Sequence, residues 1–176
     1  DVVFIHVSPP DNHGYCSLGV SVEATVAAIE SAKTVIAQVN PNMPRTFGDG
    51  ILHVSEIDFL VDVDCPIHEK EEEAITPLEA KIGAHIASLI DDKSTLQLGI
   101  GSIPNAALAN LMNHKDLGLH TEMFSDGVID LILKDVINCN YKGVTRGRVL
   151  STFMLGSKRL YDFVNDNPFI ELRESS

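Results

Sequence analysis

Glu122 is the residue of this sequence whose type and position most call for a chemical explanation. It lies in the stretch LGLHTEMFSDG (residues 117–127), where most of its near neighbours are apolar. We predict that a strand ends here, and ligands of open α/β sheets bind beyond the carboxyl ends of strands. A helix cap or a salt bridge would be the structural alternative, but Ser125 or Asp126 already offers a cap for the next helix. Glu122 is therefore a candidate for chemistry.

Gln97 is the second candidate, a polar residue near the end of the mainly apolar stretch TLQLGI. If its strand neighbours that of Glu122 in a parallel sheet, an amide donor and a carboxylate face the same crevice. A core amide with satisfied hydrogen bonds is the competing interpretation of Gln97. His120 lies two residues before Glu122 and so projects to the same face of an ideal strand. Such a pair points side by side, which weakens the case for an acid/base couple.

A glycine pair follows Gln97 in the stretch QLGIGSIPNA, between a predicted strand and a helix that we expect to begin at Pro104. Gly99 and Gly101 lack a Cβ and let a ligand approach the backbone, while the first turn of a helix attracts anions. A dinucleotide fingerprint needs a third glycine where Pro104 stands, so a nicotinamide cofactor is a minor alternative. A tight turn without a ligand is the other alternative.

Other catalytic and metal-binding patterns are not found in the sequence. The seven histidines include no pair at i, i+4 and no H-E-x-x-H, so we predict no metal site. No G-x-S-x-G elbow supports a serine nucleophile. The three cysteines are an odd number without C-x-x-C spacing, which argues against a disulfide framework and favours a reducing, cytoplasmic compartment.

The elements that would position these residues begin with strand, helix and strand. Apolar runs predict strands at 2–7 and 34–39, and helical spacing predicts a helix over 21–32 with Ser21 as its N-cap. The loop rich in Pro and Gly that follows the first strand is expected to be irregular. Together with a further strand at 57–63, this order predicts parallel pairing.

A charged segment, residues 64–76, is the best candidate for a domain boundary, with an ordinary surface loop as the alternative. The next helix starts with Thr76 as N-cap, Pro77 in the first turn and Glu79 closing a capping box. We read His85 as a structural residue of this helix. The predicted buried stripe consists of Leu78, Ile82, Ile86, Leu89 and Ile90.

Strands and helices continue to alternate to the end of the chain, which predicts an α/β fold with open sheets. The expected strands are 95–100, 117–123 and 148–155, and the expected helices are 104–113, 126–136 and 158–166.

Composition excludes several classes of protein. Of 176 residues, 44% are hydrophobic, as in a globular protein, and the net charge of -12 opposes binding to nucleic acid or to an anionic membrane. No apolar run approaches the ~20 residues that a membrane span needs. The chain opens on a strand without an initiating Met, so we interpret it as an internal part of a longer protein. The apolar surface that this leaves predicts a homo-oligomer in the full-length protein.

Five stretches, in order over most of the chain, resemble the acetyl-CoA hydrolase/transferase family. They are VSPPDNHGYCSLGVSVEAT, AQVNPNMPRTFGD, QLGIGSIPNAAL, GLHTEMFSDGVIDL and VLSTFMLGSKRLYDFVNDNP. The resemblance implies two CoA-transferase-type, Rossmann-like domains with open, mostly parallel sheets and flanking helices, here incomplete. Residues 1–68 would be the end of the N-terminal domain, and residues 69–176 the first part of the C-terminal domain that carries the catalytic glutamate.

The resemblance also implies an activity, the exchange of coenzyme A between acyl-CoA and carboxylic acids such as 4-hydroxybutyrate, butyrate and acetate. Glu122 matches the family's nucleophile, which forms an acyl-glutamyl anhydride and then a glutamyl-CoA thioester. Gln97 matches its active-site glutamine. Coenzyme A would be a substrate, with no cofactor covalently bound in the resting enzyme. The family's CoA-contacting loop matches Gly99, Ile100, Gly101, Ser102 and Ile103.

Two departures and three alternatives qualify this expectation. The family's active-site histidine lies before Asp1 and its glycine-rich CoA contacts lie after Ser176, so we expect this chain alone to be poorly active. A hydrolase of the same family would resolve the intermediate with water. A non-catalytic nucleotide-binding α/β domain would not depend on Glu122, and a dinucleotide oxidoreductase would bind a nicotinamide.

Overall fold

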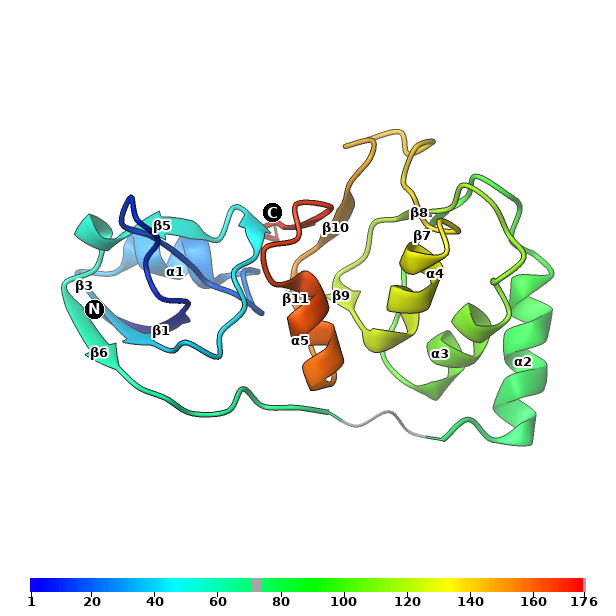
Figure 1. The fold of residues 1–176 in the computed structure, drawn as a ribbon, viewed down its shortest axis with the longest axis horizontal. Helices are drawn as coiled ribbons and strands as arrows, with labels where there is room; N and C mark the ends of the chain where they lie inside the picture. Colours follow the sequence, from blue (N-terminus) through cyan, green and yellow to red (C-terminus); the bar gives the residue numbers. More distant parts are fainter. Residues whose placement is uncertain (71–73, 176) are drawn as a thin grey trace.

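The apolar runs of the first sixty residues form one parallel sheet. In this computed structural model, which describes residues 1–70 and 74–175, β1 (Val2–Val7), β3 (Thr34–Val39) and β6 (Phe59–Asp62) pair in the order β1–β3–β6. The pairing of β1 with β3 runs over six residues of each strand and is parallel, as the strand–helix–strand order predicts. α1 (Thr25–Ser31) connects the two strands (Figure 1).

Two local predictions in this region are wrong. The helix begins at Thr25 rather than near Ser21, because Ser21 forms an antiparallel bridge with Phe153 and its hydroxyl donates to Glu23. The loop after β1 contains β2 (Tyr15–Ser17), which pairs antiparallel with β5 (Ile51–His53) before the short helix η1 (Val54–Glu56). A strand of three residues is too short to show an apolar pattern between turn-forming residues.

α2 (Pro77–Ala87) begins as predicted, and part of its predicted stripe is buried: Ile82, Ile86 and the following Ile90 are half-buried. Thr76 and Glu79 form the capping box, and Pro77 occupies the first turn. The buried residues are Gly83 and Ala87, whereas Leu78 is 68% and Leu89 84% exposed. The helix packs closely on α3 (Ser102–Ala109), since a Cβ built on Gly83 would lie 2.4 Å from the backbone carbon of Ala106. Small residues therefore form the closest contact, and the two leucines of the predicted stripe lie outside the packed face.

The second half of the molecule, from residue 74 onward, contains short parallel strand pairs instead of long strands. The expected strand 117–123 divides into β8 (Gly118–Leu119) and β9 (Met123–Phe124), and 148–155 divides into β10 (Val149–Ser151) and β11 (Phe153–Met154). β7 (Thr95–Leu96) pairs with β8, β11 with β9, and β10 with β12 (Ile170–Leu172), a strand that the sequence analysis misses. Six of the seven strand pairs among the described residues are parallel, and flanking helices complete an α/β fold.

The remaining helices are shorter than expected. η2 (Asp126–Val128) leads into α4 (Ile129–Leu133), and α5 (Lys158–Val164) lies between the two halves of the molecule (Figure 1). Within residues 1–70 and 74–175, no helix combines the length and apolar character needed to cross a membrane.

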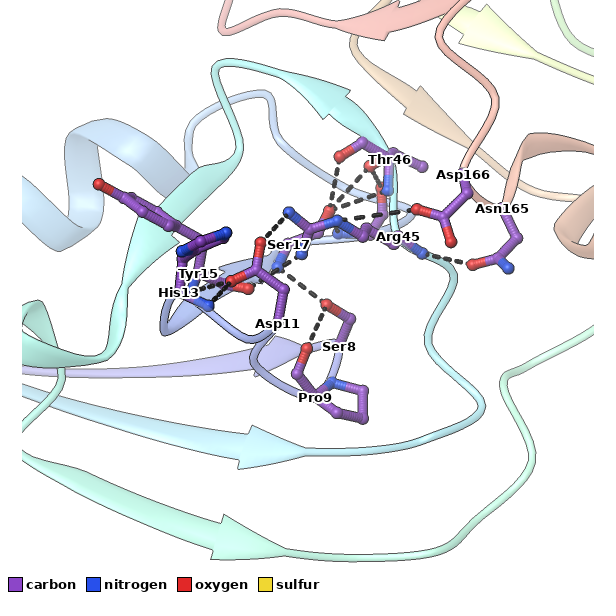
Figure 2. Close-up of polar contacts among 11 residues, drawn as sticks. Ser8, Pro9, Asp11, His13, Tyr15, Ser17, Arg45, Thr46, Asn165 and Asp166 are labelled. Carbon is purple, nitrogen blue, oxygen red and sulfur yellow. Dashed lines mark hydrogen bonds and ion pairs between the residues drawn. The ribbon is translucent and has the colours of Figure 1, made fainter.

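The two halves are connected in more than one place. An extended segment leads away from β6 up to residue 70, and β12, near the other end of the chain, pairs with β4 (Phe47–Gly48) (Figure 1). Arg45 joins the halves as well: its guanidinium lies 2.9 Å from the Asp11 carboxylate and 3.7 Å from that of Asp166, and its backbone N–H donates to Asn165 (Figure 2). The segments before and after the proposed boundary near residue 68 are therefore in contact with each other.

Candidate active site

Gln97 and Glu122 come from the ends of two neighbouring parallel strands. β7 pairs with β8 through Thr95 with Gly118 and Leu96 with Leu119, and the His120 N–H extends the ladder by donating to the Leu96 carbonyl at 2.9 Å. Both candidates follow directly after this ladder. The strands that lead to Gln97 and Glu122 are therefore parallel neighbours, as the sequence predicts.

Thr121 connects the two strand ends beyond the ladder. Its side chain is buried, and its hydroxyl accepts a hydrogen bond from the Leu98 N–H at 2.9 Å and donates to the Leu98 carbonyl at 3.0 Å. The Thr121 N–H donates in turn to the Leu150 carbonyl at 3.0 Å. One side chain thus links the residue after Gln97 to the residue before Glu122.

The backbone of Glu122 is fixed, whereas its carboxylate is free. The carbonyl oxygen accepts hydrogen bonds from the Ser151 hydroxyl at 2.8 Å and from the Thr152 N–H and hydroxyl at 2.9 and 3.0 Å. The Phe153 N–H lies 3.2 Å from the same oxygen. The side chain is exposed and makes no hydrogen bond or ion pair with any other described residue. Glu122 therefore does not serve as a cap or in a salt bridge within the described part of the chain.

An open hollow of about 570 Å³ brings three candidate side chains together. Gln97, His120 and Glu122 line it, and all three are exposed. The interpretation of Gln97 as a core amide is wrong, because its residue is exposed to solvent. The lining is completed by Thr95, Leu96, Thr121, Thr152 and Ser175.

The glycine loop lines a different, narrower hollow of about 40 Å³. Gly99 to Ser102 meet Lys70, Met123 and Ser125 there, so the loop and Glu122 line different hollows. Ile103 lines neither hollow. The helix begins at Ser102 rather than Pro104, because Gly101 has a φ of 122°, a backbone conformation that favours glycine, and serves as the N-cap.

Ser102 is held by a carboxylate from α2. Its hydroxyl donates to Glu79, which also accepts from the Thr76 N–H at 2.7 Å and the Thr76 hydroxyl at 2.6 Å. The hydrogen bond from Ser102, followed by those from Thr76, lowers the pKa of Glu79 to about 2. The capping box of α2 therefore also positions the glycine loop.

Asp126 has another role than the predicted helix cap. Its buried carboxylate accepts a hydrogen bond from the Ser157 N–H at 2.8 Å and another from the Ser157 hydroxyl, at the start of α5. Gly156 lies against it, since a Cβ there would be 2.1 Å from a carboxylate oxygen. The contact spans thirty-one residues of sequence and so was not visible in local patterns.

A buried lysine supports the strand behind the site. The Lys142 ammonium donates to the Leu119 carbonyl at 2.9 Å and to the Arg148 carbonyl at 2.8 Å. Burial lowers the pKa of Lys142. Lys142 could not be identified from the sequence, because an isolated lysine in a polar stretch is typical of a surface residue.

The described residues contain no group of three or more His, Cys, Asp and Glu side chains that could hold a metal ion. The chemistry that the hollow itself offers is a free carboxylate beside an amide donor and an imidazole.

Comparison with known proteins identifies relatives along almost the whole chain. Residues 1–75 match the family model of the acetyl-CoA hydrolase/transferase N-terminal domain. The 4-hydroxybutyrate coenzyme A transferase of Clostridium kluyveri is 53% identical over 171 residues, which are 97% of this chain and 40% of that protein. The succinyl-CoA:acetate/propanoyl-CoA:succinate CoA transferase of Fasciola hepatica is 45% identical over 98% of this chain and 36% of its own length.

Solved structures agree with these alignments. The crystal structure of 4-hydroxybutyrate CoA-transferase from Porphyromonas gingivalis superimposes with a TM-score of 0.95 at 48% identity, covering 99% of this chain and 44% of that one. The chain thus spans about 40% of the length of the curated relatives it matches. The chain is therefore similar to the acetyl-CoA hydrolase/transferase N-terminal domain over residues 1–75 and to CoA transferases over almost its whole length.

Proposed function

We propose that the protein is an acyl-CoA:carboxylate CoA-transferase of the 4-hydroxybutyrate, butyrate or acetate type, with Glu122 as its nucleophile. The observation that carries this proposal is the state of Glu122, whose backbone carbonyl is fixed by Ser151 and Thr152 while its carboxylate stands free in the hollow. A nucleophile benefits from such a fixed origin, because rate depends on the orientation of the reacting groups. The CoA-transferase relatives support the same activity.

The first half of the reaction exchanges the thioester for a covalent intermediate. A carboxylate oxygen of Glu122 attacks the acyl-CoA carbonyl, and the C–S bond breaks. The products are an acyl-glutamyl anhydride and the CoA thiolate. The thiolate then attacks the glutamyl carbonyl of the anhydride. This forms a glutamyl-CoA thioester and releases the first carboxylic acid, which takes one oxygen atom from Glu122.

The second half runs the same steps in reverse with the acceptor acid, whose oxygen replaces the one that Glu122 lost. Each step passes through a tetrahedral oxyanion, which an amide donor stabilises. We assign this role to Gln97, because it lines the hollow beside Glu122. His120 shares that hollow and receives no role in the proposal.

The CoA substrate would contact the glycine loop. Gly99, Ile100, Gly101 and Ser102 line the narrow hollow next to Met123, one residue from the nucleophile, and Ile103 follows in the same turn of α3. Backbone N–H groups at the start of a helix suit the diphosphate of CoA. Coenzyme A is a substrate in this proposal, and no cofactor is covalently bound in the resting enzyme. We further propose a cytoplasmic homo-oligomer, with residues 1–68 and 69–176 contributing to two domains.

A partition experiment tests the function. The longest natural chain that contains this sequence is incubated with butyryl-CoA and acetate, and acetyl-CoA and free CoA are quantified over time. A transferase forms acetyl-CoA in step with the loss of butyryl-CoA. Release of free CoA without acetyl-CoA would contradict the proposal and indicate a hydrolase, in which water resolves the intermediate.

A further inference from the structure

We infer that Thr121 is a positioning residue that sets the distance between Gln97 and Glu122. The inference rests on the proposed function, since it concerns how the oxyanion donor and the nucleophile are held together. Thr121 lies immediately before Glu122 in the chain, and its hydroxyl is bonded to the residue immediately after Gln97.

The strand that carries Gln97 depends on this hydroxyl because its regular pairing ends earlier. The β7–β8 ladder covers Thr95 and Leu96, and its last bond runs from the His120 N–H to the Leu96 carbonyl. Beyond that point, both hydrogen bonds that tie Leu98 to the neighbouring strand within the described residues are made by the Thr121 hydroxyl.

The strand that carries Glu122 has independent anchors. The Thr121 N–H donates to the Leu150 carbonyl, and the Glu122 carbonyl is held by Ser151 and Thr152. Loss of the Thr121 hydroxyl would therefore leave Glu122 in place and release the Gln97 segment alone. The Leu98 N–H and carbonyl, left without partners, would move toward water, because an unpaired buried polar group costs free energy.

A displacement of this kind acts on the rate more than on binding. Gln97 must lie within hydrogen-bond distance of an oxyanion that exists only in the transition state. Misplacement of a catalytic group by 1 Å can lower a rate by roughly a hundredfold. The Gln97 amide stabilises the oxyanion only when it is correctly placed. The effect of Thr121 on the rate therefore requires that the Gln97 amide is present.

Thr121→Val removes the hydroxyl and keeps the shape of the side chain. A matched control is Thr46→Val, because Thr46 is equally buried, at 3% exposure for both residues, and its hydroxyl is likewise hydrogen-bonded, to Ser17 and Gly19. Thr46 lines neither of the two hollows around Glu122. The control variant therefore measures the effect of losing a buried hydroxyl outside the two hollows.

The test is a double-mutant cycle in the longest natural chain that contains this sequence. We expect Thr121→Val to lower kcat about ten- to a hundredfold with little change in KM for acyl-CoA. Thr121→Ser should keep kcat within about threefold of the parent enzyme, since it retains the hydroxyl. Thr46→Val should keep the parent kcat. In a Gln97→Ala background, Thr121→Val should cost less than about a further threefold, because the amide that it positions is absent.

Two results would overturn the inference. In the first, the Thr121→Val enzyme has the same kcat as the Thr46→Val enzyme. In the second, the factor by which Thr121→Val lowers kcat is the same with and without Gln97→Ala, as for a general structural defect. Should the valine variant not fold, Thr121→Cys takes its place in the same cycle, because a thiol is a weaker donor and acceptor.

The outcomes also separate this inference from the proposed function. If the parent enzyme transfers no CoA, or if Glu122→Gln transfers it normally, the proposed function fails and the inference with it. If Glu122→Gln abolishes transfer and Thr121→Val leaves kcat intact, only the inference on Thr121 fails.

Discussion

The hydroxyl of Thr152 donates to the backbone carbonyl of Glu122 at 3.0 Å, while the Glu122 carboxylate has no partner among the described residues. The contact joins residues that lie thirty apart in sequence. It explains why the strand expected over 117–123 divides at this point, because the carbonyl turns to a cluster of side-chain and backbone donors. The exposed residue Glu122 lies at this division, between β8, which pairs with β7, and β9, which pairs with β11.

Gly83 provides a test of the packing that holds the glycine loop. Gly83→Ala would gain about 1 kcal/mol of helix propensity. Its Cβ would, however, lie 2.4 Å from the backbone carbon of Ala106, and overpacking against backbone costs about 1–3 kcal/mol. We therefore expect a net loss of up to about 2 kcal/mol in the free energy of unfolding, measured by urea denaturation.

Gly143→Ala is the matched control, since a Cβ there would meet nothing within 4 Å. It should change the free energy of unfolding by no more than about 0.5 kcal/mol. Equal stabilities for the two alanine variants would contradict the close contact between α2 and α3.

Glu79 should make stability depend on pH in the acid range. Its hydrogen bonds with Ser102 and Thr76 lower the pKa of its carboxyl from 4.5 to about 2. A carboxyl whose pKa is lowered in the folded state stabilises that state above the unfolded pKa and loses the effect as pH falls through the folded one. Glu79 should therefore contribute fully above pH 4.5 and cease to contribute by about pH 2.

The measurement compares the Tm of the parent protein and of Glu79→Gln across this range. At neutral pH the variant should melt at a lower temperature, and the difference should shrink toward zero as the pH approaches about 2. A difference in Tm that stays constant with pH would show that the ionised carboxylate is not the stabilising form.

Features coded by neighbouring residues could be predicted from the sequence. The capping box at Thr76 and Glu79 needs only four consecutive residues, and the runs that form β1 and β3 are continuous apolar segments. That Gln97 and Glu122 line one hollow could also be predicted, because two adjacent parallel strands end at the same edge of a sheet.

Contacts between distant segments could not be predicted in this way. The hydrogen bond that Ser157 donates to Asp126, the support from Lys142 and the pairing of β12 with β4 each depend on residues far apart in the chain. The predicted buried stripe of α2 was wrong at its two leucines for a related reason. Hydrophobicity points to Leu78 and Leu89, whereas the close approach of α3 requires the smallest side chains on the helix.

The most direct test of the account asks whether Glu122 becomes covalently modified. The longest natural chain that contains this sequence is mixed with acyl-CoA and treated with hydroxylamine, which converts a glutamyl thioester to a hydroxamate and releases CoA. Peptides are then analysed by mass spectrometry. The account predicts a hydroxamate on Glu122 that requires acyl-CoA and disappears in Glu122→Gln together with CoA transfer. A hydroxamate on a different carboxylate, or normal transfer by Glu122→Gln, would contradict it.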